Sequence, residues 1–216
     1  MAAGGLTPRA LPIMQWAMLS SLLLAIGLAN IAQPYPDLAP LQHIPTVIFT
    51  LSAPFLLRRW PLATSAVALI WIFLLLHTLG GRYIYSNVPY DEWGLALIGR
   101  PVAEMIGGSR NAYDRLVHFM FGLLCTPVFA HIARRHAVCG KRMSWFLSFA
   151  IVGLVSALYE VFEWLLTIVA AGDTADYYNG QQGDQWDAQK DMALAQLGSG
   201  IAIVIARFRS LLLAGR

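Results

Sequence analysis

The sequence predicts an all-α fold, a polytopic integral membrane bundle of about six transmembrane helices. Only 12% of the 216 residues are charged and 57% are hydrophobic, whereas a soluble domain is usually about 25% charged. The mean hydropathy is +0.57. Several apolar runs approach the roughly 20 residues that cross a ~30 Å hydrocarbon core. A single membrane domain covering residues 1–216 accounts for the whole length and leaves no soluble domain of useful size.

The apolar runs give the positions of the spans. Their approximate ranges are 11–31, 41–57, 62–79, 112–133, 143–171 and 187–206. The second run contains Pro45 and Pro54, which a helix in a bundle tolerates when neighbouring groups satisfy the freed carbonyls. A cleaved signal peptide is the alternative for the first run, because residues 27–29 form a small-x-small site. The length of the run and the single charged side chain before it, Arg9, favour a retained span.

Lysine and arginine are distributed unevenly between the two sides that six alternating spans create. One side carries Arg9, Arg58, Arg59, Arg134, Arg135, Lys141, Arg142, Arg207, Arg209 and Arg216, and the other carries Arg82, Arg100 and Arg110. The positive-inside rule predicts cytoplasmic N- and C-termini in a bacterial inner membrane, with loops 80–111 and 172–186 outside. No dense basic stripe exists, so the net charge of +3 does not indicate a nucleic-acid partner. Membrane lipids are the expected partners.

The twelve carboxylates all fall on the predicted outer side, in loops or in the outer halves of spans. An ionisable group within a span costs about 2.5–3.5 kcal/mol on insertion scales and usually faces a partner or a cavity. Residues three or four apart share one face of a helix. By this rule the spacing groups Asp114 with His118, Glu160 with Glu163, and Asp184 with Asp187 and Asp191, while His77 ends the third span. The sequence therefore predicts one outward-facing polar site.

Carboxylates and imidazoles on facing helices are the usual ligands of divalent metals in helical bundles. A cation would also relieve the repulsion among carboxylates in a low dielectric. The predicted ligands of a divalent metal ion are Asp114, His118, Glu160, Glu163, Asp184 and Asp191. The predicted catalytic groups are His77 and Asp187, one of which acts as the base. This chemistry is typical of a metal-assisted hydrolase or transferase, here acting on a lipid-linked or envelope substrate.

Two other functions stay open, and the sequence does not decide whether the protein is an enzyme. The first alternative is a non-enzymatic membrane protein, such as an envelope or glycopeptide-resistance-type factor, whose acidic network is structural. In that network Arg82, Arg115 and Lys190 pair with the acids, and Tyr113 and Tyr159 complete the hydrogen bonds. The second alternative is a transporter, which needs polar residues that continue into the inner halves of the spans, where this sequence is apolar.

Four motifs of the C-terminal two-thirds resemble the YjdF-type family of bacterial inner membrane proteins. They are HTLGGRYIY at 77–85, NAYDRLVHF at 111–119, YEVFEW at 159–164 and GDQWDAQKDM at 183–192. A more distant similarity is to VanZ-like membrane proteins, which share an acidic-basic pair followed by His-Phe, and a Y-E-x-x-Q/E element. The first resemblance implies a multi-span inner membrane protein of unknown function. The second implies an association with reduced susceptibility to the glycopeptide teicoplanin, and neither implies a reaction.

Overall fold

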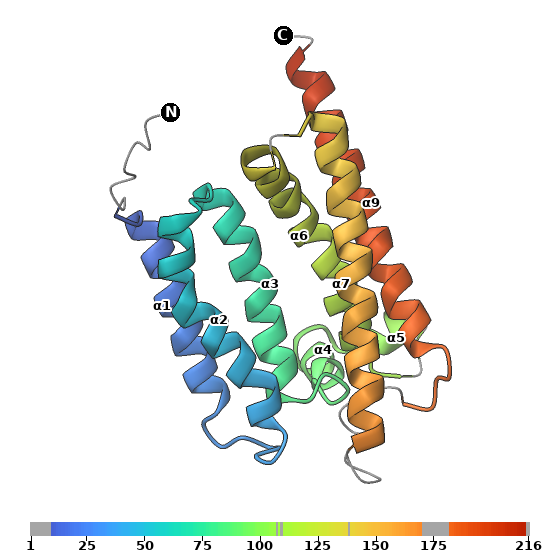
Figure 1. Ribbon diagram of the computed structural model, residues 1–216. Coiled ribbons are helices and arrows are strands. Elements are labelled where there is room, and N and C mark those ends of the chain that lie inside the picture. Colours follow the sequence, from blue (N-terminus) through green and yellow to red (C-terminus); the bar gives the residue numbers. More distant parts are fainter. Residues whose placement is uncertain (1–9, 107, 109, 138, 170–181, 215–216) are drawn as a thin grey trace.

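The computed structural model describes residues 10–106, 108, 110–137, 139–169 and 182–214, and within these ranges the regular elements are helices (Figure 1). Five helices are long and apolar enough to cross a membrane, and α1 is a shorter apolar helix of 17 residues. The elements are α1 (Ile13–Ala29), α2 (Ala39–Arg59), α3 (Thr64–Arg82), α4 (Tyr90–Ile98), α5 (Val102–Ile106), α6 (Tyr113–His136), α7 (Lys141–Val169) and α9 (Asp187–Ala214). The protein is a polytopic helical membrane protein, as the sequence predicts.

The long helices form two groups that meet through α3 and α6. Helices α1, α2 and α3 pack on one another, as do α6, α7 and α9, and the α3–α6 contact joins the two groups. Figure 1 shows that α1 begins and α9 ends at the same end of the bundle, which we call the terminal end. The short helices α4 and α5 lie at the opposite end, which we call the loop end.

Two segments differ in detail from the hydropathy pattern. The proline-containing second span is one continuous helix, α2, of 21 residues with both prolines inside it. The segment expected as a long loop after the third span contains α4 and α5. Asp91 helps to hold these two short helices together, since its Oδ1 accepts a 2.7 Å hydrogen bond from the Ala103 backbone N–H. The segment is therefore folded against itself.

The seam between α6 and α9 is built from small residues. A Cβ added at Gly122 would clash with the backbone of Ala195, and one at Gly198 would clash with the Phe119 carbonyl. The hydroxyls of Thr126 and Ser199 hydrogen-bond across the seam at 2.7 Å. Small residues allow the backbones of two helices to approach closely. They are common between membrane helices because lipid is as apolar as the side chains, so that association depends on close packing and not on the hydrophobic effect. This close seam fixes the register of α6 against α9.

A tight turn after α3 explains the Gly-Gly-x-Tyr-x-Tyr part of the first motif. Ile84 and Tyr85 both have positive φ angles, 45° and 55°, a conformation that is rare for a β-branched residue. The turn returns the Tyr85 ring onto Gly80, where a Cβ would lie 2.7 Å from Tyr85 Cε1, and Tyr85 N–H donates to the Gly80 carbonyl at 2.8 Å. Glycine at position 80 is thus required for the placement of Tyr85.

Candidate functional site

The α6–α9 seam continues toward the loop end into a group of ionisable side chains. On α6 the residues Gly122 and His118 lie four apart, and Asp114 lies a further four residues toward the loop end. On α9 the same step leads from Ala195 to Asp191. Residues four apart lie on one face of a helix, so the register set by the small residues brings Asp191 next to Asp114 and His118.

We call Asp114, His118, Glu160, Glu163 and Asp191 the buried cluster. Nε2 of His118 lies 3.7 Å from Asp114 Oδ1 and 3.6 Å from Glu160 Oε1. One potential ligand atom from each of Asp114, His118 and Asp191 lies within 4.8 Å of the other two, a spacing that could hold a metal ion. All five side chains are buried, although the helices that carry them come from three parts of the chain.

Several oxygens of the buried cluster have unused hydrogen-bonding capacity. Oε1 of Glu160 and Oδ1 of Asp191 are buried and make no hydrogen bond within the described part of the chain, and the Asp191 residue is only 2% exposed. A buried polar atom without a partner costs free energy comparable to a lost hydrogen bond. Glu163 follows Glu160 by three residues and interacts electrostatically with Asp114, Glu160 and Asp191. The cluster thus has more negative groups than internal donors to satisfy them.

A second group of charges lies closer to the loop end, and we call it the ion-paired layer. Arg110 approaches both carboxylate oxygens of Asp187, at 2.7 and 3.2 Å. Arg115 pairs with Asp184 at 2.5 Å and with Asp187 at 3.1 Å, and Lys190 pairs with Asp184 at 2.6 Å. Three cations therefore neutralise two carboxylates, and the start of α9 is attached to α6 and to the residues that precede it.

The ion-paired layer changes the acidity of Asp184. The Lys190 ammonium, the backbone N–H of Trp186 and the Arg115 guanidinium all hydrogen-bond the carboxylate and lower the pKa of Asp184 to about 2. Hydrogen bonds and opposite charges favour the ionised form of a carboxyl group. Asp184 is therefore a permanent anion at physiological pH whose charge is already balanced by protein side chains.

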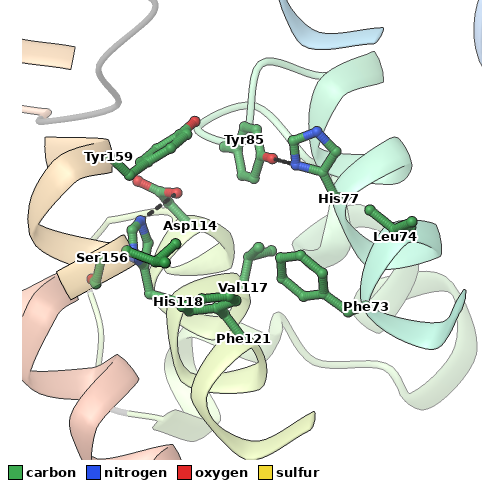
Figure 2. A pocket seen from close by; sticks show the side chains of 11 residues that line it. Phe73, Leu74, His77, Tyr85, Asp114, Val117, His118, Phe121, Ser156 and Tyr159 are labelled. Atoms are coloured by element: carbon green, nitrogen blue, oxygen red, sulfur yellow. Dashed lines mark hydrogen bonds and ion pairs between the residues drawn. The ribbon is translucent and has the colours of Figure 1, made fainter. Parts of the chain in front are cut away.

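A cavity of about 230 Å³ separates the buried cluster from a histidine–tyrosine pair, as Figure 2 shows. Asp114 and His118 line one side of it and His77 and Tyr85 the other. The Tyr85 hydroxyl and His77 Nδ1 are joined by a hydrogen bond, and the His77 ring interacts electrostatically with the backbone of Gln42. The pair is thus held in place by contacts with α2 and with the turn after α3.

The buried cluster also borders a second opening, between α7 and α9. This groove has a volume of about 430 Å³ and is lined by Glu160, Glu163, Asp187 and Asp191 among others. The carboxylates of the buried cluster therefore lie between two cavities. A small polar molecule would have two approaches to them from the surface of the bundle.

The structure brings together most, but not all, of the residues that the spacing singles out. Asp114, His118, Glu160, Glu163 and Asp191 converge, whereas Asp184 and Asp187 take part in the ion-paired layer. His77 lies across the cavity.

Two further groups at the site receive no role from the sequence. Arg110, which precedes α6, binds Asp187, and Tyr85 binds His77. The Y-x-Y at the end of the first motif was the one signal available for Tyr85.

Among the described residues Arg82 pairs with no acid, contrary to the expectation for a structural network. Its guanidinium donates hydrogen bonds to the carbonyls of Ala29 and Ile31 at the end of α1, at 2.7 and 2.9 Å, and more weakly to that of Ala32. Carbonyls at a helix C-terminus have no partner within the helix, and a cation there is favourable. Arg82 therefore ties α3 to α1. Arg115 and Lys190 do pair with acids, as expected.

The fold and these buried ionisable groups define a multi-span helical membrane protein with a polar site inside the bundle. The chain belongs to the family described as "Predicted membrane protein (DUF2238)", which matches residues 14–210. It is 39% identical over 153 residues to the inner membrane protein YjdF of Escherichia coli (strain K12), a match that covers 70% of this chain and 69% of that protein. No solved structure matches the chain. The resemblance to the YjdF-type family is thereby confirmed, and the VanZ-like similarity stays a prediction.

Proposed function

We propose that this inner membrane protein is a metal-assisted hydrolase or transferase that acts on a lipid or another envelope substrate. The observation that carries the proposal is the donor set of Asp114, His118 and Asp191, whose ligand atoms lie within 4.8 Å of one another in buried positions. Adjacent carboxylates in a low dielectric need a proton or a cation. The ion-paired layer has its cations already, and the buried cluster has only His118 among the ion pairs of the described residues.

Four residues of the buried cluster form the proposed ligand set. Asp114, His118 and Asp191 would hold a divalent ion, and Glu160, whose Oε1 makes no hydrogen bond within the described residues, would supply a further ligand. Carboxylate oxygen and imidazole nitrogen suit zinc, manganese, iron or magnesium. Such an ion polarises a phosphoryl or acyl group, or lowers the pKa of a bound water so that it becomes a nucleophile.

The His77–Tyr85 pair supplies the proton transfer. It faces the cavity from the side opposite the metal ligands, and a positioned acid or base of this kind typically contributes a factor of about 10²–10⁴ to a rate. Asp187 is less suited to that task, because its carboxylate is bound by two guanidinium groups. We therefore assign Asp187 and Asp184 to holding α9 in place, and His77 with Tyr85 to catalysis.

The orientation of the site follows the asymmetry of Lys and Arg in the sequence. The terminal end of the bundle carries most of the basic residues, so the positive-inside rule puts both termini in the cytoplasm. The loop end, with the buried cluster and its two cavities, then faces outward. A substrate of the outer leaflet or of the cell envelope would reach the site from that side.

A structural role for the acids is the second candidate, and the ion-paired layer favours it for Asp184 and Asp187. Those two residues have the partners that a structural network requires. The ion pairs of the buried cluster include no arginine or lysine among the described residues, which favours ligand binding there. A transporter gains no support, because the cavity between the polar site and the terminal end has mainly apolar walls.

Metal analysis tests the proposal directly. Detergent-purified wild type, the Asp114→Asn, Asp191→Asn double variant and the control Asp37→Asn, which changes an exposed acid, are compared by plasma mass spectrometry and by thermal unfolding. We expect a near-stoichiometric divalent metal in wild type and control, and its loss from a double variant that remains folded. Wild type without metal, or a folded double variant that retains it, would sink the proposal.

A further inference from the structure

A second cavity, larger than the one between His77 and His118, lies closer to the terminal end of the bundle. We call it the apolar cavity. It has a volume of about 640 Å³, is partly open to the surface and is bordered by α1, α2, α3 and α6 toward the terminal end, and its size is within the ~300–1,000 Å³ typical of ligand sites. Two of its polar lining groups are already bonded: the Thr50 hydroxyl donates to the Thr46 carbonyl at 2.7 Å, and the Trp71 indole N–H donates to Ser21 at 3.0 Å. Water would find few partners there, and apolar cavities of this kind stay dry.

The length of this apolar cavity matches one leaflet of a bilayer. Its lining residues extend along α6 from Cys125 to His136 and along α2 from Phe49 to Trp60. At 1.5 Å per residue each of these stretches rises about 16 Å. Half of a ~30 Å hydrocarbon core is about 15 Å, which is the depth occupied by the chain of one phospholipid.

The apolar cavity and the polar one share part of their lining. Phe73 and Leu74 line both cavities. Figure 2 shows Phe73 and Phe121 at the floor of the polar cavity, and their ring centroids are 5.5 Å apart. A molecule that passes these side chains would have a hydrocarbon end among apolar residues and a polar end beside the buried cluster.

We infer that the apolar cavity binds one acyl chain of a membrane glycerophospholipid and presents the ester or phosphate of that lipid to Asp114 and His118. The chain fits because the cavity is one leaflet deep, offers few free polar atoms and meets the polar cavity at Phe73 and Leu74, which line both. The orientation of the lipid rests on the proposed function, because only this orientation places the ester or phosphate beside the proposed metal ligands.

The experiment fills the cavity and measures bound lipid. Val128→Phe and Val67→Phe each place a ring in the apolar cavity, and Val204→Phe makes the same change at a half-exposed position of α9 that does not line it. The four proteins are purified in mild detergent, their retained lipids are extracted and identified by mass spectrometry, and metal is measured in the same samples. We expect about one phospholipid per wild-type chain and an approximately tenfold loss in both cavity variants, since overpacking of this order weakens binding by that factor.

The outcomes separate this inference from the proposed function. Phospholipid lost from both cavity variants and kept by Val204→Phe supports the inference, whether or not metal is found. If the phospholipid results are as expected but the wild-type protein contains no metal, the proposed function alone is overturned. Equal phospholipid in all four proteins, no lipid in wild type, or a polyprenyl lipid as the retained molecule overturns the inference.

Discussion

Two groups of carboxylates lie next to each other at the loop end of the bundle, and they differ in their counter-charges. Asp184 and Asp187 are bound by Arg110, Arg115 and Lys190. Asp114 and Glu160 have only His118 within ion-pairing distance among the described residues. One group has the complete partners of a structural network, and the other has ligand atoms spaced so that they could hold a cation.

This difference shows that acidity alone does not define a site. Both groups contain buried or half-buried carboxylates, and both involve α6 and α9. The cations of the ion-paired layer come from Arg110, which precedes α6, and from the first turns of α6 and α9. These side chains bind Asp184 and Asp187, and they leave the buried cluster one helical turn away without an arginine or lysine in the described ion pairs. We expect the two groups to respond in opposite ways to removal of a carboxylate.

The largest effect is expected from Asp187→Ala. Removal of this carboxylate leaves Asp184 as the remaining carboxylate partner of the Arg110 and Arg115 guanidinium groups, and breaking a buried pair costs about 3–5 kcal/mol. The two arginine side chains retain 16% and 24% exposure, so we expect the lower end, about 3 kcal/mol, in the free energy of unfolding in detergent. Glu160→Gln, in the buried cluster, is the matched control and should change stability little. Equal losses in both variants would remove the distinction between the two groups.

A metal-dependent gain in stability is the next largest effect. A ligand that binds only the folded state stabilises by about 2.7 kcal/mol when present at 100 times its Kd. We expect chelation to lower the unfolding temperature of wild type and of Asp184→Asn, and readdition of a divalent metal to restore it. Asp191→Asn should show no response, because it removes one of the three closely spaced ligands. A response of Asp191→Asn equal to that of wild type would contradict the assignment of the cluster as the metal centre.

Much of the fold and part of the site are predictable from the sequence. Hydropathy reveals the long helices because an apolar run of sufficient length has one stable arrangement in a bilayer. The spacing of Asp114 with His118 predicts their shared face because helix geometry is local. The division of the acids into two groups depends on the register of α9 against α6, which the contacts of Gly122 and Gly198 set, and no local pattern contains that register.

Other features depend on backbone conformations that a pattern does not specify. Tyr85 reaches His77 because Ile84 and Tyr85 adopt positive φ angles, and hydropathy gives no indication of such a turn. Arg110 reaches Asp187 across 77 residues of sequence. Arg82 binds the end of α1 because two helices that are distant in sequence end at the same level. Each of these contacts requires knowledge of the tertiary arrangement.

A smaller effect on stability is expected when the hydrogen bond between Tyr85 and His77, across the cavity from the buried cluster, is removed. Tyr85→Phe removes the hydroxyl that hydrogen-bonds His77, and a typical hydrogen bond contributes about 1 kcal/mol to stability. Tyr83→Phe, in the same turn, is the control, and its stability and metal content should match those of wild type. If Tyr85 acts in proton transfer, Tyr85→Phe should keep its metal while any turnover falls and its pH profile changes. Loss of metal from Tyr85→Phe would place Tyr85 among the ligands instead.

The smallest effect concerns the pH range over which the ion-paired layer holds. The pKa of Asp184 is lowered to about 2 by its hydrogen bonds with Lys190, Trp186 and Arg115, whereas an unfolded aspartate has a pKa of about 3.9. A group with a lowered folded-state pKa stabilises the fold fully above its unfolded pKa, and this stabilisation declines as the pH falls toward the folded value. The difference in unfolding temperature between wild type and Asp184→Asn should therefore be constant from pH 7 to about pH 5 and shrink below pH 4. A difference that already disappears between pH 7 and pH 5 would mean that these ion pairs do not hold Asp184 as an anion, and that the contrast between the two acidic groups has another origin.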